Sequence, residues 1–348
     1  MINPANIKYY FFYIATTIII VAGLKAASEV VIVLLLSIFI ATIFTAFLQF
    51  LRSHKVPKSI AYLISTIIFV AVLVLLIFIF NHSLNNFITS LPLYEEKIKI
   101  LIFNSTNILE KYGVTIGENE ISEVLDMNYF AKVTTNVLGG IGTFFSKFII
   151  ITIGVSFIIA ESKSFEKKLL MIFKNDISKL ISFKLFSHNM QRYFIVKTFT
   201  SFLTGLIFTI LLLIFGVEYP ILWGVLAFLF NFIPIVGSII ASIPAILLSL
   251  INLDINTTLW LISIYVAVNI SISNMLEPKL MGRELGLSPM VIFFALIFIG
   301  WTLGIAGMFL AVPITMTLKI AFESSKSTRW IAILLSDLSQ VKNISADK

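Results

Sequence analysis

Polar side chains recur at every fourth position within one apolar stretch of the chain. The residues in this line are Tyr265, Asn269, Ser273 and Glu277. Residues four apart share one face of an α-helix, so a phenol, an amide, a hydroxyl and a carboxylate are expected to line up. A polar line on a membrane helix normally faces the bundle interior or a water path. The spacing therefore predicts a polar route through an apolar surrounding.

Glu277 is the candidate for proton coupling in this line. A carboxylate moved into a low-dielectric environment binds a proton more readily, which suits a group that exchanges protons during transport. The alternative is an ion pair of Glu277 with Lys279 or Arg283 at the cytoplasmic surface. Two other acids have plainer interpretations. Asp254 is expected to cap a helix or lie in an outer loop, and Glu218 is expected to lie at the membrane interface.

Residues that interrupt helices form a matched pattern in the C-terminal half. Pro220 and Pro244 are as far apart along the chain as Pro289 and Pro313, and each pair brackets an apolar segment. The interrupting residues are Asn231, Pro234 and Gly237 in the first segment and Gly300, Gly304 and Gly307 in the second. Proline lacks an amide donor and restricts the residue before it, whereas glycine is permissive. The pattern indicates two interrupted hairpins in inverted repeat, which points to a transporter site; the alternative is two kinked helices without a transport role.

The composition requires a membrane around these segments. Of the 348 residues, 59% are hydrophobic and 12% are charged, against about 45–50% and about 25% in a soluble domain. This excludes an ordinary cytosolic enzyme and a disordered chain. The sequence contains no cysteine, which excludes disulfides and Cys-ligated metals.

Long apolar runs define the expected architecture. A bilayer core needs about 20 mostly apolar residues per helix. The expected full spans are residues 9–24, 30–51, 59–80, 144–160, 198–215 and 257–276, and the hairpins are residues 221–250 and 289–318. The sequence therefore predicts an all-α, polytopic integral membrane protein with about six full spans, two interrupted (re-entrant) helical hairpins in inverted repeat and an outer helical segment.

Basic residues set the expected orientation. Lysines and arginines cluster between the second and third spans and again after the fourth, and such loops stay in the cytoplasm. These residues are Arg52, Lys55, Lys58, Lys163, Lys167, Lys168, Lys174, Lys179, Lys184, Arg192 and Lys197. Residues 81–143 carry more acidic residues than lysines and are expected outside. Both termini are then cytoplasmic.

The expected organisation follows from these assignments. It comprises residues 1–80 (three spans), 81–143 (extracytoplasmic helical segment), 144–162 (fourth span), 163–192 (basic cytoplasmic segment), 193–320 (transport core) and 321–348 (cytoplasmic tail). The outer segment contains an amphipathic pattern at Ile98, Leu101, Ile108 and Tyr112. It is interpreted as a lid or collar, with a ligand-binding domain as the alternative. The basic segment suits a helix on anionic lipid, so no nucleic-acid partner is expected.

Motifs of enzymes are missing from the sequence. There is neither a G-x-x-x-x-G-K-[ST] phosphate loop nor an H-E-x-x-H metal motif, and these would mark an ATP site or a zinc protease. The 3 histidines lie outside the apolar runs, which argues against an intramembrane Ser–His pair. We therefore expect no enzyme, no cofactor and no metal site.

Three ordered motifs resemble one known family. The first motif is N-F-I-P-I-V-G at residues 231–237, followed by I-P at 243–244. The second is N-M-L-E-P-K-L-M-G at residues 274–282. The third consists of L-S-P at 287–289, G-I-A-G at 304–307 and A-V-P at 311–313. These stretches resemble the autoinducer-2 exporter family, also called PerM-type permeases. Two departures are Ser238, where many members have a second proline, and Phe199-Thr200, where a more polar pair is common.

The resemblance implies a bacterial inner-membrane secondary transporter that forms homo-oligomers. Our leading hypothesis is export of a small polar solute, such as an autoinducer-2-like signal, by alternating access. The alternatives are a monovalent cation (sodium or lithium)/proton antiporter and a non-transporting membrane scaffold. The partners expected are membrane lipid and either the solute or the cation. The residues expected to line or gate the path are Asn231, Pro234, Gly237, Asn269, Ser273, Asn274, Glu277, Pro278, Gly282, Gly304 and Gly307.

Overall fold

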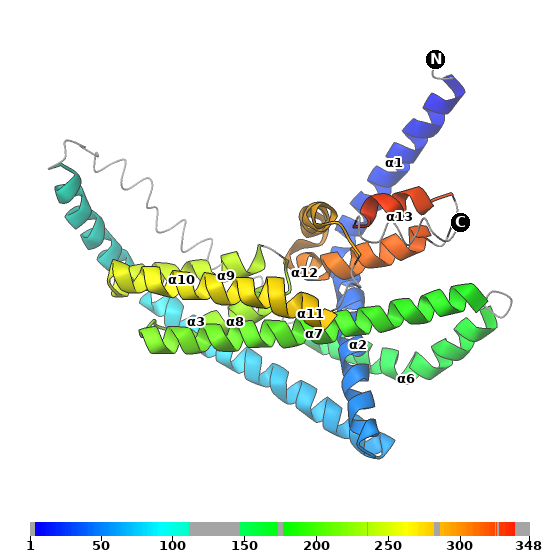
Figure 1. Ribbon diagram of the computed structural model, residues 1–348, viewed down its shortest axis with the longest axis horizontal. Coiled ribbons are helices and arrows are strands. Elements are labelled where there is room, and N and C mark those ends of the chain that lie inside the picture. The colour runs from blue at the N-terminus through cyan, green and yellow to red at the C-terminus, as the bar shows by residue number, and fades with distance from the viewer. Residues whose placement is uncertain are drawn as a thin grey trace. The chain divides into compact units, whose positions relative to one another are not determined.

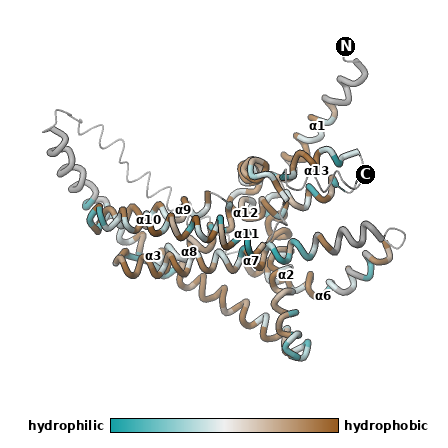
Figure 2. The backbone as a smooth tube through the Cα atoms, in the orientation of Figure 1, coloured by the Kyte–Doolittle hydropathy of each residue, from teal (hydrophilic) through white to brown (hydrophobic). Residues whose placement is uncertain are grey.

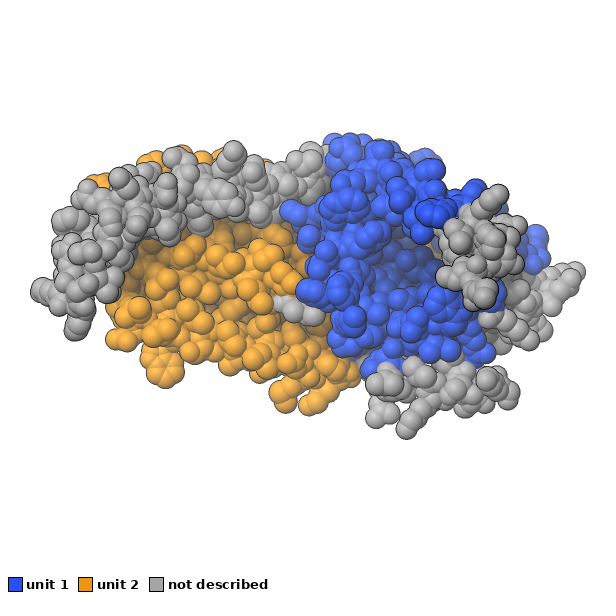
Figure 3. Space-filling model, turned by 90° about the horizontal axis from the view of Figure 1, so that it is seen from above, with its two compact units in different colours: residues 1–56, 147–196, 281–348 blue, residues 57–146, 197–280 orange. Residues whose placement is uncertain are grey.

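The computed structural model describes residues 4–110, 147–172, 177–234, 236–281, 286–323, 325 and 327–337. These residues form helices and contain no strand, apart from one isolated bridge between Leu287 and Ser336. The chain divides into two compact units (Figure 3). Unit 1 comprises Met1–Val56, Lys147–Val196 and Met281–Lys348, and unit 2 comprises Pro57–Ser146 and Lys197–Leu280.

Apolar helices dominate the described part of the chain (Figures 1 and 2). By length and composition, 5 helices could cross a membrane: Ser28–Ser53, Lys58–Tyr94, Ser187–Phe215, Ile255–Met281 and Pro289–Glu323. The expected first and fourth spans appear as the shorter apolar helices Phe11–Ala26 and Phe148–Ser162. The prediction of an all-α, polytopic membrane protein is confirmed.

Unit 1 packs around a cluster of apolar and aromatic side chains. Its helices are α1 (Pro4–Ala26), α2 (Ser28–Ser53), α6 (Phe148–Ile172), the start of α7 (Ile177–Phe215), α12 (Pro289–Glu323) and α13 (Arg329–Leu335). Phe39 of α2 and Phe194 of α7 lie with ring centroids 4.1 Å apart, next to Val312 and Met316 of α12. Aromatic pairs at this separation add to the stabilisation from buried area.

The backbone of α12 is broken at Gly304. This residue has φ 68° and ψ −160°, a conformation outside the helical range. A Cβ placed on Gly307 would lie 2.6 Å from the carbonyl oxygen of Ile299. Residues eight apart in a straight helix are about 12 Å apart along the axis, so the chain folds back here. Of the three glycines expected to interrupt this segment, Gly304 carries the break.

The C-terminal part of unit 1 holds the entry to α12. The Ser288 amide donates to the Leu335 carbonyl at 3.0 Å, and the Asp337 amide donates to the Gly286 carbonyl at 3.1 Å. The Lys319 ammonium also donates to the Gly286 carbonyl, at 2.9 Å. Lys319 is buried, and this hydrogen bond gives its ammonium a partner inside unit 1.

Unit 2 contains the first hairpin. Its helices are α3 (Lys58–Glu110), the rest of α7, α8 (Pro220–Phe230), α9 (Gly237–Asn252), α10 (Ile255–Ser271), the π-helix η1 (Ile272–Leu276) and most of α11 (Glu277–Met281). Helices α8 and α9 pack against each other across the turn at residues 231–236. A Cβ on Gly237 would overlap the Phe230 carbonyl oxygen. The turn therefore closes only because residue 237 has no side chain.

Helix α3 runs without interruption past residue 80, where the outer segment was expected to begin. It continues through Pro92 to Glu110, and residues 111–146 of that segment lie outside the described part. Phe87 of α3 packs on Trp223 of α8 with ring centroids 5.1 Å apart. Tyr219, which precedes α8, adopts a left-handed conformation with φ 56°, and its hydroxyl lies 2.9 Å from that of Ser90. These contacts hold the N-terminal end of the first hairpin against α3.

Asp254 caps α10, as expected. Its carboxylate accepts a hydrogen bond of 3.0 Å from the Thr257 amide, which satisfies one of the free donors at the helix start. The hydrogen bond from the Thr257 side chain, followed by that from its amide, lowers the pKa of Asp254. A carboxylate with a lowered folded-state pKa stabilises the fold above its unfolded pKa and loses this effect as the pH falls through the folded value.

We expect Asp254→Ala to lower the apparent melting temperature at neutral pH. The difference from the parent protein should shrink as the pH falls below about 3.9, the usual aspartate value. Thermal unfolding in detergent, followed by tryptophan fluorescence over a series of pH values, measures this. A difference that stays constant down to the lowest pH would contradict the capping role.

Candidate functional site

The buried face of α7 changes character along its length in unit 2. Where α7 enters unit 2, it buries four polar residues whose side chains are almost fully shielded from solvent. Apolar residues follow on the same face. The polar residues are Lys197, Thr200, Ser201 and Thr204, and the apolar ones are Phe208 and Leu212. Residues at this spacing share one helical face. A helix that buries hydroxyls and an ammonium beside an apolar core has a polar stripe inside unit 2.

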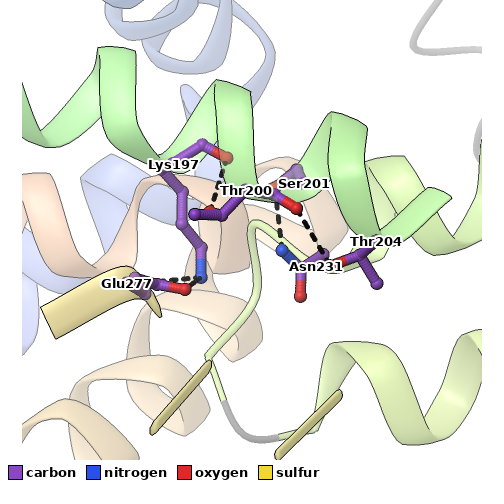
Figure 4. Close-up of polar contacts among 6 residues, drawn as sticks. All are labelled: Lys197, Thr200, Ser201, Thr204, Asn231 and Glu277. Atoms are coloured by element: carbon purple, nitrogen blue, oxygen red, sulfur yellow. Dashed lines mark hydrogen bonds and ion pairs between the residues drawn. The ribbon is translucent and has the colours of Figure 1, made fainter. Parts of the chain in front are cut away.

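Lys197 and Glu277 form a buried ion pair within this stripe. The ammonium nitrogen lies 2.9 and 3.0 Å from the two carboxylate oxygens, and Figure 4 shows the two groups pointing at each other. Only 6% of the Lys197 side chain and 15% of the Glu277 side chain are exposed. The expected partners were Lys279 or Arg283; the structure assigns Lys197, and Arg283 lies outside the described residues.

Helices α7 and α10 approach each other with opposite directions. Phe208 and Tyr265 have ring centroids 4.2 Å apart, and Lys197 meets Glu277 farther along. Residues later in α10 and η1 therefore pair with residues earlier in α7, so the two helices are antiparallel. This register places Asn269 at the level of Thr204, and the next polar residue, Ser273, one helical turn nearer to the ion pair.

Asn231 anchors the turn of the first hairpin to α7. The residue is buried, and its amide nitrogen donates to the Ser201 hydroxyl oxygen at 3.0 Å (Figure 4). It lies at the end of α8, and the turn continues through Pro234, whose missing amide donor prevents α8 from continuing. The turn residue and the polar face of α7 therefore form one hydrogen-bonded site.

Asn269 connects α10 to the beginning of α9. Its amide nitrogen donates to the Ser238 hydroxyl at 3.0 Å, while the Tyr265 hydroxyl donates to the Ser238 carbonyl at 2.8 Å. The residue that departs from the family pattern thus supplies two acceptors. Within the described residues, the side-chain amide oxygen (Oδ1) of Asn269 and the Thr198 hydroxyl are buried without a hydrogen-bond partner, which is unusual for buried polar atoms.

A π-helical turn separates Asn269 from Glu277. The turn η1 contains Ser273 and Asn274, and single π turns inside α-helices are frequent at functional sites. A π turn contains more residues than an α-helical turn, so it rotates the side chains that follow it about the helix axis. The regular spacing of four therefore did not by itself determine where Glu277 points.

Comparison with known proteins identifies the family of this chain. A sequence profile described as AI-2E family transporter matches residues 14–327. The chain belongs to the AI-2E transporter family. Similar proteins include the AI-2 transport protein TqsA of Escherichia coli K12, which is 32% identical over 305 residues, or 88% of this chain and 89% of that protein. A putative transport protein of Haemophilus influenzae is 34% identical over 319 residues, 88% of this chain and 90% of that protein.

A third relative of this AI-2E family transporter is the putative transport protein YhhT of Escherichia coli K12. It is 27% identical over 300 residues, which cover 86% of each chain. The matched region includes every helix of both units that contributes to the site and to the hairpins. The protein is a multi-pass membrane protein of a transporter family.

The structure brings only part of the expected site together. Asn231, Asn269 and Glu277 each contact a polar partner inside unit 2, whereas Asn274 is exposed. Pro278 is exposed in α11 directly after Glu277, and Gly282 lies outside the described residues. Pro234 and Gly237 form the turn of the first hairpin. Gly304 and Gly307 belong to the second hairpin, in unit 1.

Sequence reasoning missed Lys197 as a member of the site. It was counted with the basic residues of a cytoplasmic loop because other lysines and Arg192 precede it. The available signal was local: the apolar residues Phe194 to Val196 precede Lys197, and no charged residue follows it before Glu218. A lysine in such surroundings indicates a buried partner.

Proposed function

We propose that this AI-2E family transporter is a secondary transporter of the bacterial inner membrane that exports a small polar solute by alternating access. The observation that supports this is the polar face of α7, which is shielded from solvent and bonded to the turn of the first hairpin through Ser201 and Asn231. Hydroxyls and amides suit a solute with several hydroxyl groups. The name of TqsA, an AI-2 transport protein, favours an autoinducer-2-like cargo.

The two hairpins would act as gates in this proposal. The first is held closed by the Asn231–Ser201 hydrogen bond, and the second turns at Gly304, where the backbone departs from the helix. Non-helical backbone at membrane depth is tolerated where it lines a cavity or is buried in protein. We propose that the hairpins are re-entrant and opposite in orientation, with both termini cytoplasmic, and that the transporter works as a homo-oligomer.

A second candidate is monovalent cation (sodium or lithium)/proton antiport. The observation that favours it is the shielded Glu277 carboxylate, since antiport needs a group that exchanges a proton and a cation. Its salt bridge to Lys197 weakens this candidate, because the charge is already neutralised. A non-transporting scaffold is the third candidate.

Flux into proteoliposomes distinguishes the three candidates. Uptake of labelled autoinducer-2 without dependence on cations supports export. Cation-dependent proton movement that disappears in Glu277→Gln supports antiport. If a folded protein moves neither, both transport proposals are wrong and the scaffold remains.

We expect Asn231→Leu to reduce solute flux strongly in a folded protein. The substitution removes the donor to the Ser201 hydroxyl, and loss of a buried hydrogen-bond partner costs about 1–3 kcal/mol. The closed form of the turn should become roughly tenfold less populated relative to the open form. Flux in vesicles with equal amounts of protein measures this, and Asn256→Leu, at an exposed position near the start of α10, is the matched control. Equal flux for the two variants would contradict the gate assignment.

A further inference from the structure

The proposed transport site contains a positively charged side chain, the ammonium group of Lys197. The Lys197 ammonium lies 2.9 and 3.0 Å from both oxygens of the Glu277 carboxylate. Sodium and lithium are hard ions, and such ions prefer oxygen ligands, with carboxylates prominent among them. The position that a small cation would need beside Glu277 is therefore taken by a nitrogen of the chain.

We propose that Lys197 is the internal counter-cation of Glu277 and that its ammonium keeps sodium and lithium out of the empty transporter. This inference rests on the proposed transport function and deepens it. It assigns the cargo to the class of neutral polar solutes, and it makes Lys197 the residue that determines this specificity.

The charges of the site support this assignment. One ammonium and one carboxylate sum to zero, so the empty site has no net charge to carry through the membrane. An unpaired carboxylate buried inside a membrane protein is far more costly in free energy than a paired one. A neutral solute leaves the sum at zero, whereas a cation that joined the pair would leave a net positive charge.

The polar residues drawn beside the pair are neutral, so they offer a cation oxygen atoms but no second negative charge. The groups beside the pair are hydroxyls and an amide, from Thr200, Ser201 and Asn231 (Figure 4). Among the residues that the structure describes, no group of three or more acidic, histidine or cysteine side chains is placed to hold a metal ion. A cation site at this place would thus depend on the carboxylate that Lys197 already occupies.

Binding of radioactive sodium to the purified full-length protein tests the proposal. The proteins compared are the parent, Lys197→Met, Glu277→Gln and the double variant Lys197→Met/Glu277→Gln. We expect sodium binding to appear only in Lys197→Met, at least tenfold above the parent level, because only this variant has a free carboxylate. Unlabelled lithium chloride should compete with the bound sodium, and choline chloride should not.

Two results of the binding assay would overturn the proposal. One is sodium binding by the parent protein that disappears in Glu277→Gln, since sodium would then reach the carboxylate with Lys197 present. The other is a folded Lys197→Met variant that binds no sodium. None of these measurements uses flux, so a failure of the transport proposal itself, seen as no solute movement in vesicles, is recognised separately.

Lys197→Met has an unpaired buried carboxylate and is itself at risk of misfolding. It is therefore also extracted in sodium chloride, lithium chloride or choline chloride, and the yield of monodisperse protein is compared by size-exclusion chromatography. Recovery that requires sodium or lithium supports the proposal, because the ion then replaces the ammonium. Failure in all three salts contradicts it.

Discussion

Glu277→Gln is expected to destabilise the protein more than the double variant Lys197→Met/Glu277→Gln. The single substitution leaves the Lys197 ammonium buried without its counter-charge, and breaking a buried pair in this way costs about 3–5 kcal/mol. Removing both charges leaves two side chains of similar volume and no lone charge, which is often close to neutral. The apparent melting temperature in detergent should therefore fall in the single variant and recover in the double variant.

A surface ion pair provides the control. Lys168 and Glu161 lie 2.7 Å apart, but 61% and 60% of their side chains are exposed. Exposed pairs contribute little to stability, so Glu161→Gln should melt with the parent protein. If Glu277→Gln also melts with the parent protein, the buried pair does not exist in the folded molecule. If the double variant is no more stable than Glu277→Gln, the effect does not arise from the unpaired charge.

Gly237→Ala is expected to prevent the first hairpin from closing. The added methyl would overlap the Phe230 carbonyl oxygen, and a backbone atom cannot move aside as a flexible side chain can. Overpacking in a close-packed interior typically costs about 1–3 kcal/mol. We expect a lower melting temperature and loss of flux, because Ser238 and Asn231 on either side of the turn would also be displaced from their partners.

Gly23→Ala is the matched control for this substitution. Gly23 lies in α1, and a Cβ placed there meets no atom within 4 Å. Alanine is a better helix former than glycine by about 1 kcal/mol, so this variant should be as stable as the parent protein or slightly more stable. A Gly237→Ala protein that melts and transports like Gly23→Ala would show that the hairpin does not close as described.

Features that depend on neighbouring residues were predictable from the sequence. The break at Gly304, the turn around Pro234 and Gly237, and the cap at Asp254 each follow from the backbone or side-chain properties of residues close in the chain. The apolar runs likewise gave the membrane helices, since their length is set by the bilayer. The uninterrupted course of α3 past residue 80 was not predicted, because the span was ended where the chain becomes more polar. No proline or glycine interrupts the helix there before Pro92.

Contacts between distant residues account for what was missed. Lys197 and Glu277 are separated by 80 positions, and no local pattern connects them. The topology rule assigned every lysine near a basic cluster to a loop, although burial with a partner explains Lys197 equally well. The π turn η1 was also unforeseen, because no residue in Ile272–Leu276 distinguishes it from a regular helix. Ser238 became a site residue only through Asn269, on another helix.

The left-handed Tyr219 restricts where the first hairpin can move. A non-glycine residue in this conformation is strained and persists only where its surroundings hold it. Here the Ser90 hydroxyl and the ring of Phe87, 5.8 Å away, hold it against α3. The N-terminal end of α8 is thus fixed against α3, since a rigid-body movement of the whole hairpin would release Tyr219 from both contacts. If the hairpin opens as proposed, the motion occurs at its tip, where the hydrogen bonds from Asn231 to Ser201 and from Asn269 and Tyr265 to Ser238 would have to break.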